Sequence, residues 1–146
     1  MLMENILKLG QARLCPPTLE QIAALAAIDL PNSYFDEVLE EYQRRRDIVY
    51  DALMEIPGII CQKPKGAFYI IAKLPVKDAE DFAIFMLDTF AIDNETVMFA
   101  PAAGFYGTKG VGLDEIRIAY VLNTDDLKRA MYILKEGLER YKTLKE

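Results

Sequence analysis

The chain has 146 residues, of which 52% are hydrophobic and 27% are charged, and its mean hydropathy is +0.06. These values lie in the range of globular proteins and exclude a disordered, collagen-like or disulfide-rich chain. The 17 basic and 23 acidic side chains leave a net charge of −6, which argues against a surface for nucleic acid or anionic membrane. We therefore expect one packed domain, with no nucleic acid and no membrane among its partners.

The residue types that are rare or missing exclude several kinds of chemistry. Histidine is absent, which excludes Ser-His and Cys-His nucleophile pairs, imidazole metal sites and a histidine pH switch. Cys15 and Cys61 fit neither a redox motif nor a zinc-ligand spacing, so we expect two reduced core thiols and no metal. No stretch is apolar enough to span a membrane and the first residues do not resemble a signal peptide, so we expect a cytoplasmic protein.

Apolar spacing and turn signals predict eight elements along the chain. Taken in order, they are helices over 19–30 and 33–56, strands over 59–61 and 67–72, a helix over 78–90, strands over 96–99 and 115–121, and a helix over 123–145. Residues 62–66 read as the turn of a hairpin. Strands grouped between helices indicate an α+β fold, a two-layer sandwich with an antiparallel or mixed sheet.

The two N-terminal helices have features that are unusual for a small domain. The first is apolar on all sides from Ile22 to Ile28, so it requires packing partners, and we expect the isolated chain to associate through it and through the long helix that follows. The second has about 22 residues and a length of roughly 33 Å, which is enough to link two domains.

Two conspicuous patterns favour structural interpretations. Four glycines between residues 104 and 112 match neither phosphate-binding fingerprint, and a strand follows them, so they predict a surface loop. Arg44–Arg46 lie inside the long predicted helix, where three successive residues spread over nearly a full turn and form no flat patch. The acidic residues of the same helix read as its solvated face.

Arg117 is the best candidate for a functional residue. Strand alternation places Ile116 and Ile118 on one face of the strand. Arg117 lies on the other face, together with small apolar neighbours such as Ala119. A guanidinium in the middle of a strand needs a carboxylate or water at its tip, and its planar fork matches a carboxylate bidentately. That partner is either a substrate acid or an internal Asp or Glu, or else the side chain reaches to solvent.

Six short segments, none specific by itself, stand in a definite order along the chain: Gln11–Gln21, Glu41–Asp47, Pro57-Gly58, Pro64–Tyr69, Ala100–Phe105 and Ile116–Tyr120. Together they resemble the C-terminal third of class I aminotransferases, most closely the bacterial aspartate aminotransferases. The resemblance extends over nearly the whole chain.

This resemblance implies a fragment of a homodimeric pyridoxal-phosphate enzyme of type I fold. Residues 1–32 would be a remnant of the large domain and its interface, and residues 33–146 the C-terminal small domain with its long linking helix. In the family, the cofactor is bound mainly by the large domain, and its Schiff-base lysine lies in a Ser/Thr-x-x-Lys stretch. Lys65, Lys73 and Lys109 do not follow that pattern, so we expect no catalytic or cofactor-binding residue here and no activity of the chain alone.

One family role carries over by residue. Arg117 matches the arginine that grips the substrate α-carboxylate, which implies amino-acid and 2-oxo-acid substrates. Gly104 and Phe105 match a loop near the active site, usually written Pro-Gly-x-x-Phe, although Ala102 follows Pro101 here. Two alternatives remain: a non-catalytic interaction or regulatory domain with the same fold, and a lyase or decarboxylase on the same scaffold.

Overall fold

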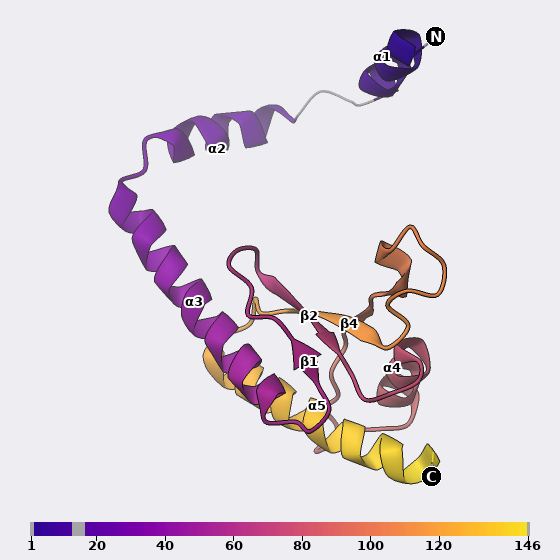
Figure 1. The fold of residues 1–146 in the computed structure, drawn as a ribbon. Helices are drawn as coiled ribbons and strands as arrows, with labels where there is room; N and C mark the ends of the chain where they lie inside the picture. The colour runs from indigo at the N-terminus through magenta and orange to yellow at the C-terminus, as the bar shows by residue number, and fades with distance from the viewer. Residues whose placement is uncertain (1, 13–16, 146) are drawn as a thin grey trace. The chain divides into compact units, whose positions relative to one another are not determined.

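The computed structural model describes residues 2–12 and 17–145, and the chain divides into two compact units at the boundary between Glu37 and Val38. The first unit contains helices α1 (Leu2–Ala12) and α2 (Thr18–Ile28) and the start of α3 (Asn32–Met54) (Figure 1). Helix α1 was not expected from the apolar spacing. The predicted core position of Cys15 lies outside the described residues.

Helices α1 and α2 contain no buried residue among those described. The large apolar side chains of α2, at Leu19, Ile22, Leu25 and Ile28, are all exposed. Pro17 is the N-cap residue of α2, and it has no polar side chain with which to bind the free backbone N–H groups. Helix α2 therefore gains little stability from packing or capping within the described chain.

The second unit is built on a four-stranded antiparallel sheet. Its strand order is β1-β2-β4-β3, and its elements are β1 (Ile60–Cys61), β2 (Tyr69–Lys73), α4 (Ala79–Asp88), β3 (Ala100–Pro101), β4 (Glu115–Ala119) and α5 (Thr124–Lys145). Strands β1 and β2 form the predicted hairpin, with Ile60 opposite Lys73. The α+β class and the two-layer sandwich are confirmed.

One hydrophobic core lies between the sheet and its helices. It takes Ile70 and Ile116 from the sheet, Leu53 from α3, Phe82 from α4 and Leu134 from α5, each at most 1% exposed. Because strand side chains alternate, burying these positions leaves the other face of β2 and β4 uncovered by the helices of this unit, as Figure 1 shows for the sheet layer. The site described below lies on that open face.

The starts of α4 and α5 agree with their sequence signals, whereas the capping residues Thr18 and Ser33 that the sequence indicated lie inside α2 and α3. Asp78 accepts a hydrogen bond from the Glu80 amide at 2.8 Å and so caps α4. Asn123 caps α5, since its side-chain oxygen accepts from the amides of Asp125 and Asp126 at 3.1 and 3.0 Å. Gly58, just after α3, has a φ of +88°, and a Cβ there would lie 3.0 Å from the Pro75 ring.

The strand predicted over 96–99 is wrong, since the residues that pair with β4 are Ala100 and Pro101. Thr96 instead donates its hydroxyl to the Met86 carbonyl at 2.7 Å, and Phe99 stacks on Phe82 with ring centroids 5.4 Å apart. This segment is fixed by side-chain packing rather than by a strand ladder. Phe99 is buried and Val97 is half-buried, and strand propensity does not distinguish such burial from pairing in a strand ladder.

Cys61 packs against the core as a half-buried free thiol. Its Sγ lies 3.7 Å from the Met54 Sδ, and burial raises the pKa of the thiol. The thiolate is therefore disfavoured, which is typical of a structural rather than a reactive cysteine.

Candidate functional site

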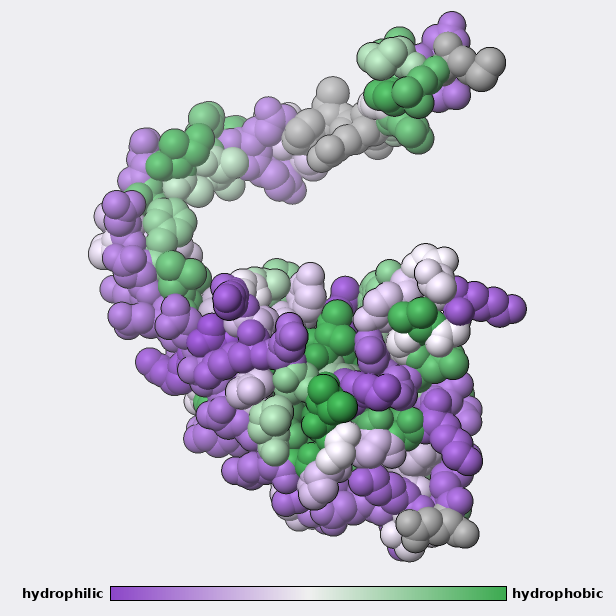
Figure 2. All heavy atoms as spheres, viewed as in Figure 1, coloured by the Kyte–Doolittle hydropathy of each residue, from purple (hydrophilic) through white to green (hydrophobic). Residues whose placement is uncertain are grey.

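Arg117 lies at the centre of the open face of the sheet. The register places Ile71 of β2 opposite Arg117 on one side and Ala100 of β3 on the other. The neighbours of Arg117 along β4, Ile116 and Ile118, are buried in the core, so the predicted alternation is confirmed. Figure 2 shows hydrophobic atoms gathered over β1 and β2 between hydrophilic margins.

Two aromatic rings flank the Arg117 guanidinium. Its Cζ lies 4.2 Å from the centroid of Phe105 and 5.3 Å from that of Tyr69. Within the described part of the chain, no carboxylate forms an ion pair with Arg117 and no group forms a hydrogen bond with its side chain. The internal ion pair that the sequence left open is therefore not formed by these residues.

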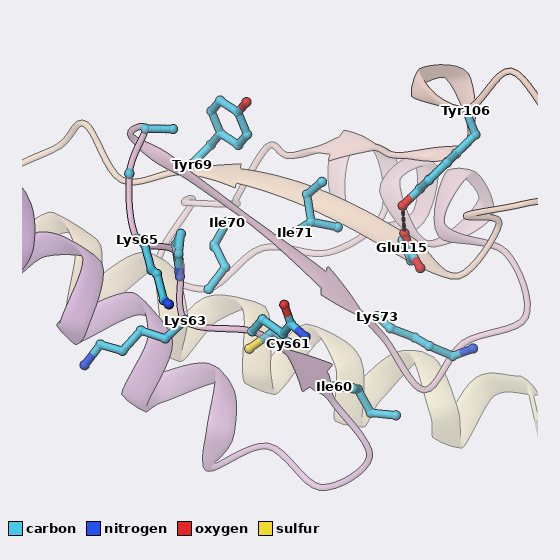
Figure 3. A pocket seen from close by; sticks show the side chains of 14 residues that line it. Ile60, Cys61, Lys63, Lys65, Tyr69, Ile70, Ile71, Lys73, Tyr106 and Glu115 are labelled. Atoms are coloured by element: carbon cyan, nitrogen blue, oxygen red, sulfur yellow. Dashed lines mark hydrogen bonds between the residues drawn. The ribbon is translucent and has the colours of Figure 1, made fainter.

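The glycine-rich loop brings Phe105 to this site. It starts with a 3₁₀ turn, η1 (Ala103–Phe105), and the hydroxyl of Tyr106 donates to the Glu115 carboxylate, as the dashed line in Figure 3 marks. This hydrogen bond raises the pKa of Tyr106, because a negative charge beside the phenol disfavours ionisation. Gly112 has a φ of +73°, and a Cβ there would collide with the Tyr106 ring, so this position requires glycine.

A shallow basic hollow lies beside the site, between the β1–β2 hairpin and the open face (Figure 3). Its volume is about 720 Å³, and its charged lining residues are Lys63, Lys65, Lys73 and Glu115. Lys63 pairs with Asp47 at 2.9 Å, and Lys73 pairs with Asp114 at 2.8 Å, which raises the pKa of Lys73. Arg117 is not part of this lining, so the hollow and the arginine are neighbouring features of one surface.

The described residues do not form a pyridoxal-phosphate site by themselves. Enzymes of this kind attach the cofactor to a lysine and place an Asp or Arg on its ring nitrogen. No charged or polar residue in the described part of the chain is buried, and Lys65, Lys73 and Lys109 are all exposed. These residues also contain no group of three or more metal-binding side chains, and no helix among them is long and apolar enough to cross a membrane.

Arg45 and Arg46 of α3 support the site in a way that the sequence analysis missed. Arg45 donates to the Val121 carbonyl at 2.7 Å, just after β4, and Arg46 donates to the Pro64 carbonyl at 3.3 Å, in the turn before β2. They therefore hold the segments that adjoin the two central strands, whereas the sequence analysis assigned these arginines no contact. One signal in the sequence could have indicated these contacts. Both arginines lie three or four residues before the apolar Val49, which is buried, so they lie next to the packed face of the helix.

The turn before β2 is also fixed at Ala67. This residue has a positive φ of 64°, and its carbonyl accepts a hydrogen bond from the Tyr120 hydroxyl at 3.1 Å. Burial raises the pKa of Tyr120, so its hydroxyl remains a donor. The bond holds an unfavourable backbone conformation two residues before Tyr69, whose ring is one of the two at Arg117.

This arrangement, with helices on one face of an antiparallel sheet and a long helix before it, is the small domain of the type I aminotransferases. Residues 3–134 match the family "Aminotransferase class I and II", and the chain belongs to that family. It is similar to the aspartate aminotransferase of Bacillus subtilis, with 29% identity over 86% of this chain and 31% of that protein.

Two solved structures support the assignment. An alanine aminotransferase from Pyrococcus furiosus superposes with a TM-score of 0.72 at 33% identity, over 94% of this chain and 34% of that chain. The α-aminoadipate aminotransferase LysN of Thermus thermophilus was solved with N-(5'-phosphopyridoxyl)-L-leucine. It superposes with a TM-score of 0.78 at 25% identity, over 97% of this chain and 37% of that chain. The chain thus spans about a third of the length of these relatives.

Proposed function

We propose that this chain supplies the substrate α-carboxylate site of a pyridoxal-phosphate aminotransferase, similar to aspartate aminotransferase, which transfers an amino group from an amino acid to a 2-oxo acid. In this proposal, residues 33–146 are the small domain and residues 1–32 belong with the large domain. Because the described residues do not form a cofactor site, the proposal assigns pyridoxal phosphate to the part of the relatives that this chain does not match.

The observation that carries the proposal is the guanidinium of Arg117 on the open sheet face, which has no anionic partner among residues 2–12 and 17–145. A planar guanidinium binds a carboxylate through two parallel N–H···O bonds, which fix the position of the carboxylate and also its plane. Such a pair orients the bonds at the substrate Cα, so Arg117 contributes by binding and positioning and transfers no proton. The match of Arg117 to the family arginine agrees with this geometry.

Carboxylate binding by the chain tests the proposal directly. We expect L-aspartate and L-alanine to shift the Arg117 Nε–Hε signal and the backbone amide signals of β4 in a ¹⁵N NMR titration until saturation. L-Alaninamide, which lacks the carboxylate, serves as the ligand control, and Arg117→Lys, followed through the backbone amides, as the protein control. Equal responses to L-alanine and L-alaninamide, or saturable binding by Arg117→Lys as tight as in the wild type, would contradict the proposal.

Kinetics of the complete enzyme test the same residue during turnover. Replacing Arg117 by Lys removes the bidentate fork, so we expect kcat/KM for the amino acid to fall roughly 100-fold, or about 3 kcal/mol. The products distinguish transamination from the lyase and decarboxylase alternatives, because all three would bind the same carboxylate. A non-catalytic domain would show no turnover and no effect of Arg117.

The reading frame upstream of Met1 tests the proposed assignment of the cofactor. We expect it to encode a Ser/Thr-x-x-Lys stretch that supplies the lysine for pyridoxal phosphate. An in-frame stop codon and a ribosome-binding site directly before Met1 would favour the interaction-domain alternative.

We also propose that the protein is a cytoplasmic homodimer. The exposed apolar side chains of α2 support association. Sedimentation velocity of the chain is expected to show concentration-dependent association that weakens in Leu25→Glu, with Glu20→Gln as the matched control on the same helix. A monomer at every concentration would contradict association through α2.

A further inference from the structure

Arg117 is held by two rings that approach it from opposite sides of β4. Tyr69 belongs to β2, and Phe105 to the turn that follows β3, and in the strand order β2 and β3 lie on either side of β4. A guanidinium within about 6 Å of a ring centroid is attracted to the ring face. Both distances, 4.2 and 5.3 Å, are within that limit.

Phe105 contributes to this contact rather than to the core. It is 55% exposed, and it makes no ring–ring contact with the rest of the described chain. A large apolar side chain left this exposed adds little to folding. The Arg117 guanidinium, 4.2 Å away, is its close polar neighbour.

The backbone around Phe105 keeps the ring in place. The Phe105 amide donates to the Ala102 carbonyl at 2.9 Å, and the Ala102 amide donates to the Glu115 carbonyl of β4 at 2.8 Å. Tyr106, the next residue, is bonded through its hydroxyl to the Glu115 side chain. Phe105 is therefore connected by two short links to the strand that carries Arg117.

We propose that Phe105 is a positioning residue, which holds the Arg117 guanidinium with its edge presented to the carboxylate of the substrate, while Tyr69 restrains it from the other side. This inference rests on the proposed function. An arginine without an anionic partner samples many rotamers, and ordering it when the ligand binds lowers affinity. Ordering the guanidinium before the ligand arrives removes part of that loss.

The test compares Phe105→Leu, Phe105→Tyr and Val111→Ala with the wild-type chain. Leucine keeps an apolar side chain at position 105 but removes the aromatic ring, whereas tyrosine retains the ring. Val111 belongs to the same loop and is also exposed, so Val111→Ala controls for a general disturbance of the loop. Denaturant unfolding of each variant checks that the fold is kept.

The first readout needs no ligand. In ¹⁵N relaxation experiments on the chain, we expect the heteronuclear NOE of the Arg117 Nε–Hε group to fall in Phe105→Leu. It should stay at the wild-type value in Phe105→Tyr and Val111→Ala. A general loss of stability would change backbone amides throughout the sheet and not this side-chain signal alone.

The second readout is the affinity for L-alanine, measured by titration. We expect Phe105→Leu to bind about two- to five-fold more weakly than the wild type, and Phe105→Tyr to recover the affinity. Wild-type order and affinity in Phe105→Leu, or an equal loss in Val111→Ala, would overturn the positioning role and leave the proposed function intact. Failure of the wild-type chain to bind any carboxylate would overturn both.

Discussion

The two faces of the sheet differ in what their side chains do, although the same strands provide both. On one face, Ile70, Ile116 and Ile118 are at most 6% exposed and pack against the helices. On the other face, Tyr69 and Ile71 are 39% and 40% exposed and surround a guanidinium with no anionic partner among the described residues. The pleat of the strands thus places the residues that stabilise the fold on one face and the residues proposed to bind the substrate on the other. Substitutions on each face test this separation.

The largest effect on stability is expected from Ile116→Ala. This side chain is fully buried, so its truncation leaves a cavity and lowers the free energy of unfolding by about 2–5 kcal/mol. The matched control, Ile71→Ala on the open face, is expected to cost less than about 1 kcal/mol. Denaturant unfolding measures both, and equal losses would show that the faces are not separate in stability.

The next largest effect is expected from Gly112→Ala. Glycine adopts the φ of +73° easily, whereas an alanine Cβ would collide with the Tyr106 ring, so we expect the loop to be destabilised by about 1–3 kcal/mol. Hydrogen exchange at the Phe105 and Tyr106 amides measures this locally. Gly107→Ala is the control, since no atom lies within 4 Å of its added Cβ, and matching exchange in both variants would refute the steric argument.

A smaller effect on stability is expected from Arg117→Lys. No ion pair to described residues is lost, and each cation–π contact at such a site contributes about 0.5–1 kcal/mol, so we expect the free energy of unfolding to change by about 1 kcal/mol or less. The same substitution is expected to abolish saturable carboxylate binding. A loss of stability as large as that of Ile116→Ala would assign Arg117 a structural role instead.

The smallest effect concerns the hydrogen bond between Tyr106 and Glu115. A folded-state pKa above the ordinary 10.0 means that this contact stabilises the loop below pH 10.0 and is lost as the pH rises through the raised pKa. The ¹³Cζ signal of Tyr106 is therefore expected to titrate above pH 10.0. Glu115→Gln removes the negative charge and should return the midpoint towards 10.0; a wild-type midpoint at or below 10.0 would contradict the contact.

Local patterns in the sequence were sufficient to predict much of the fold. Alternation along residues 115–121 identified the face of Arg117, and the signals at Asp78 and Asn123 identified the starts of two helices. Each of these depends on interactions between residues that are close in sequence. The apolar spacing of residues 78–90 also predicts inward positions at Phe82, Met86 and Leu87. Phe82 and Met86 are buried, but Leu87 is 55% exposed.

The features that were missed depend on contacts between distant segments. The family resemblance placed Phe105 in a loop near the active site, but it did not give the contact of this ring with Arg117. That contact forms because β3 pairs with β4, and it could not be derived from the glycines of the loop. Likewise, the hydrogen bond from Arg45 joins residues 76 positions apart. Periodicity carries no information on such contacts, so the side chains around Arg117 required the tertiary structure.

The hydrogen bonds from Arg45 and Arg46 to Val121 and Pro64 also have a mechanical consequence. They join the middle of α3 to the ends of both central strands, while Val49 and Leu53 of the same helix are buried in the core. Turning this part of the helix against the sheet would break both bonds and open the core. From Arg45 onward, we therefore expect α3 and the sheet to move together. A rotation of this part of the helix would also move the strand that carries Arg117.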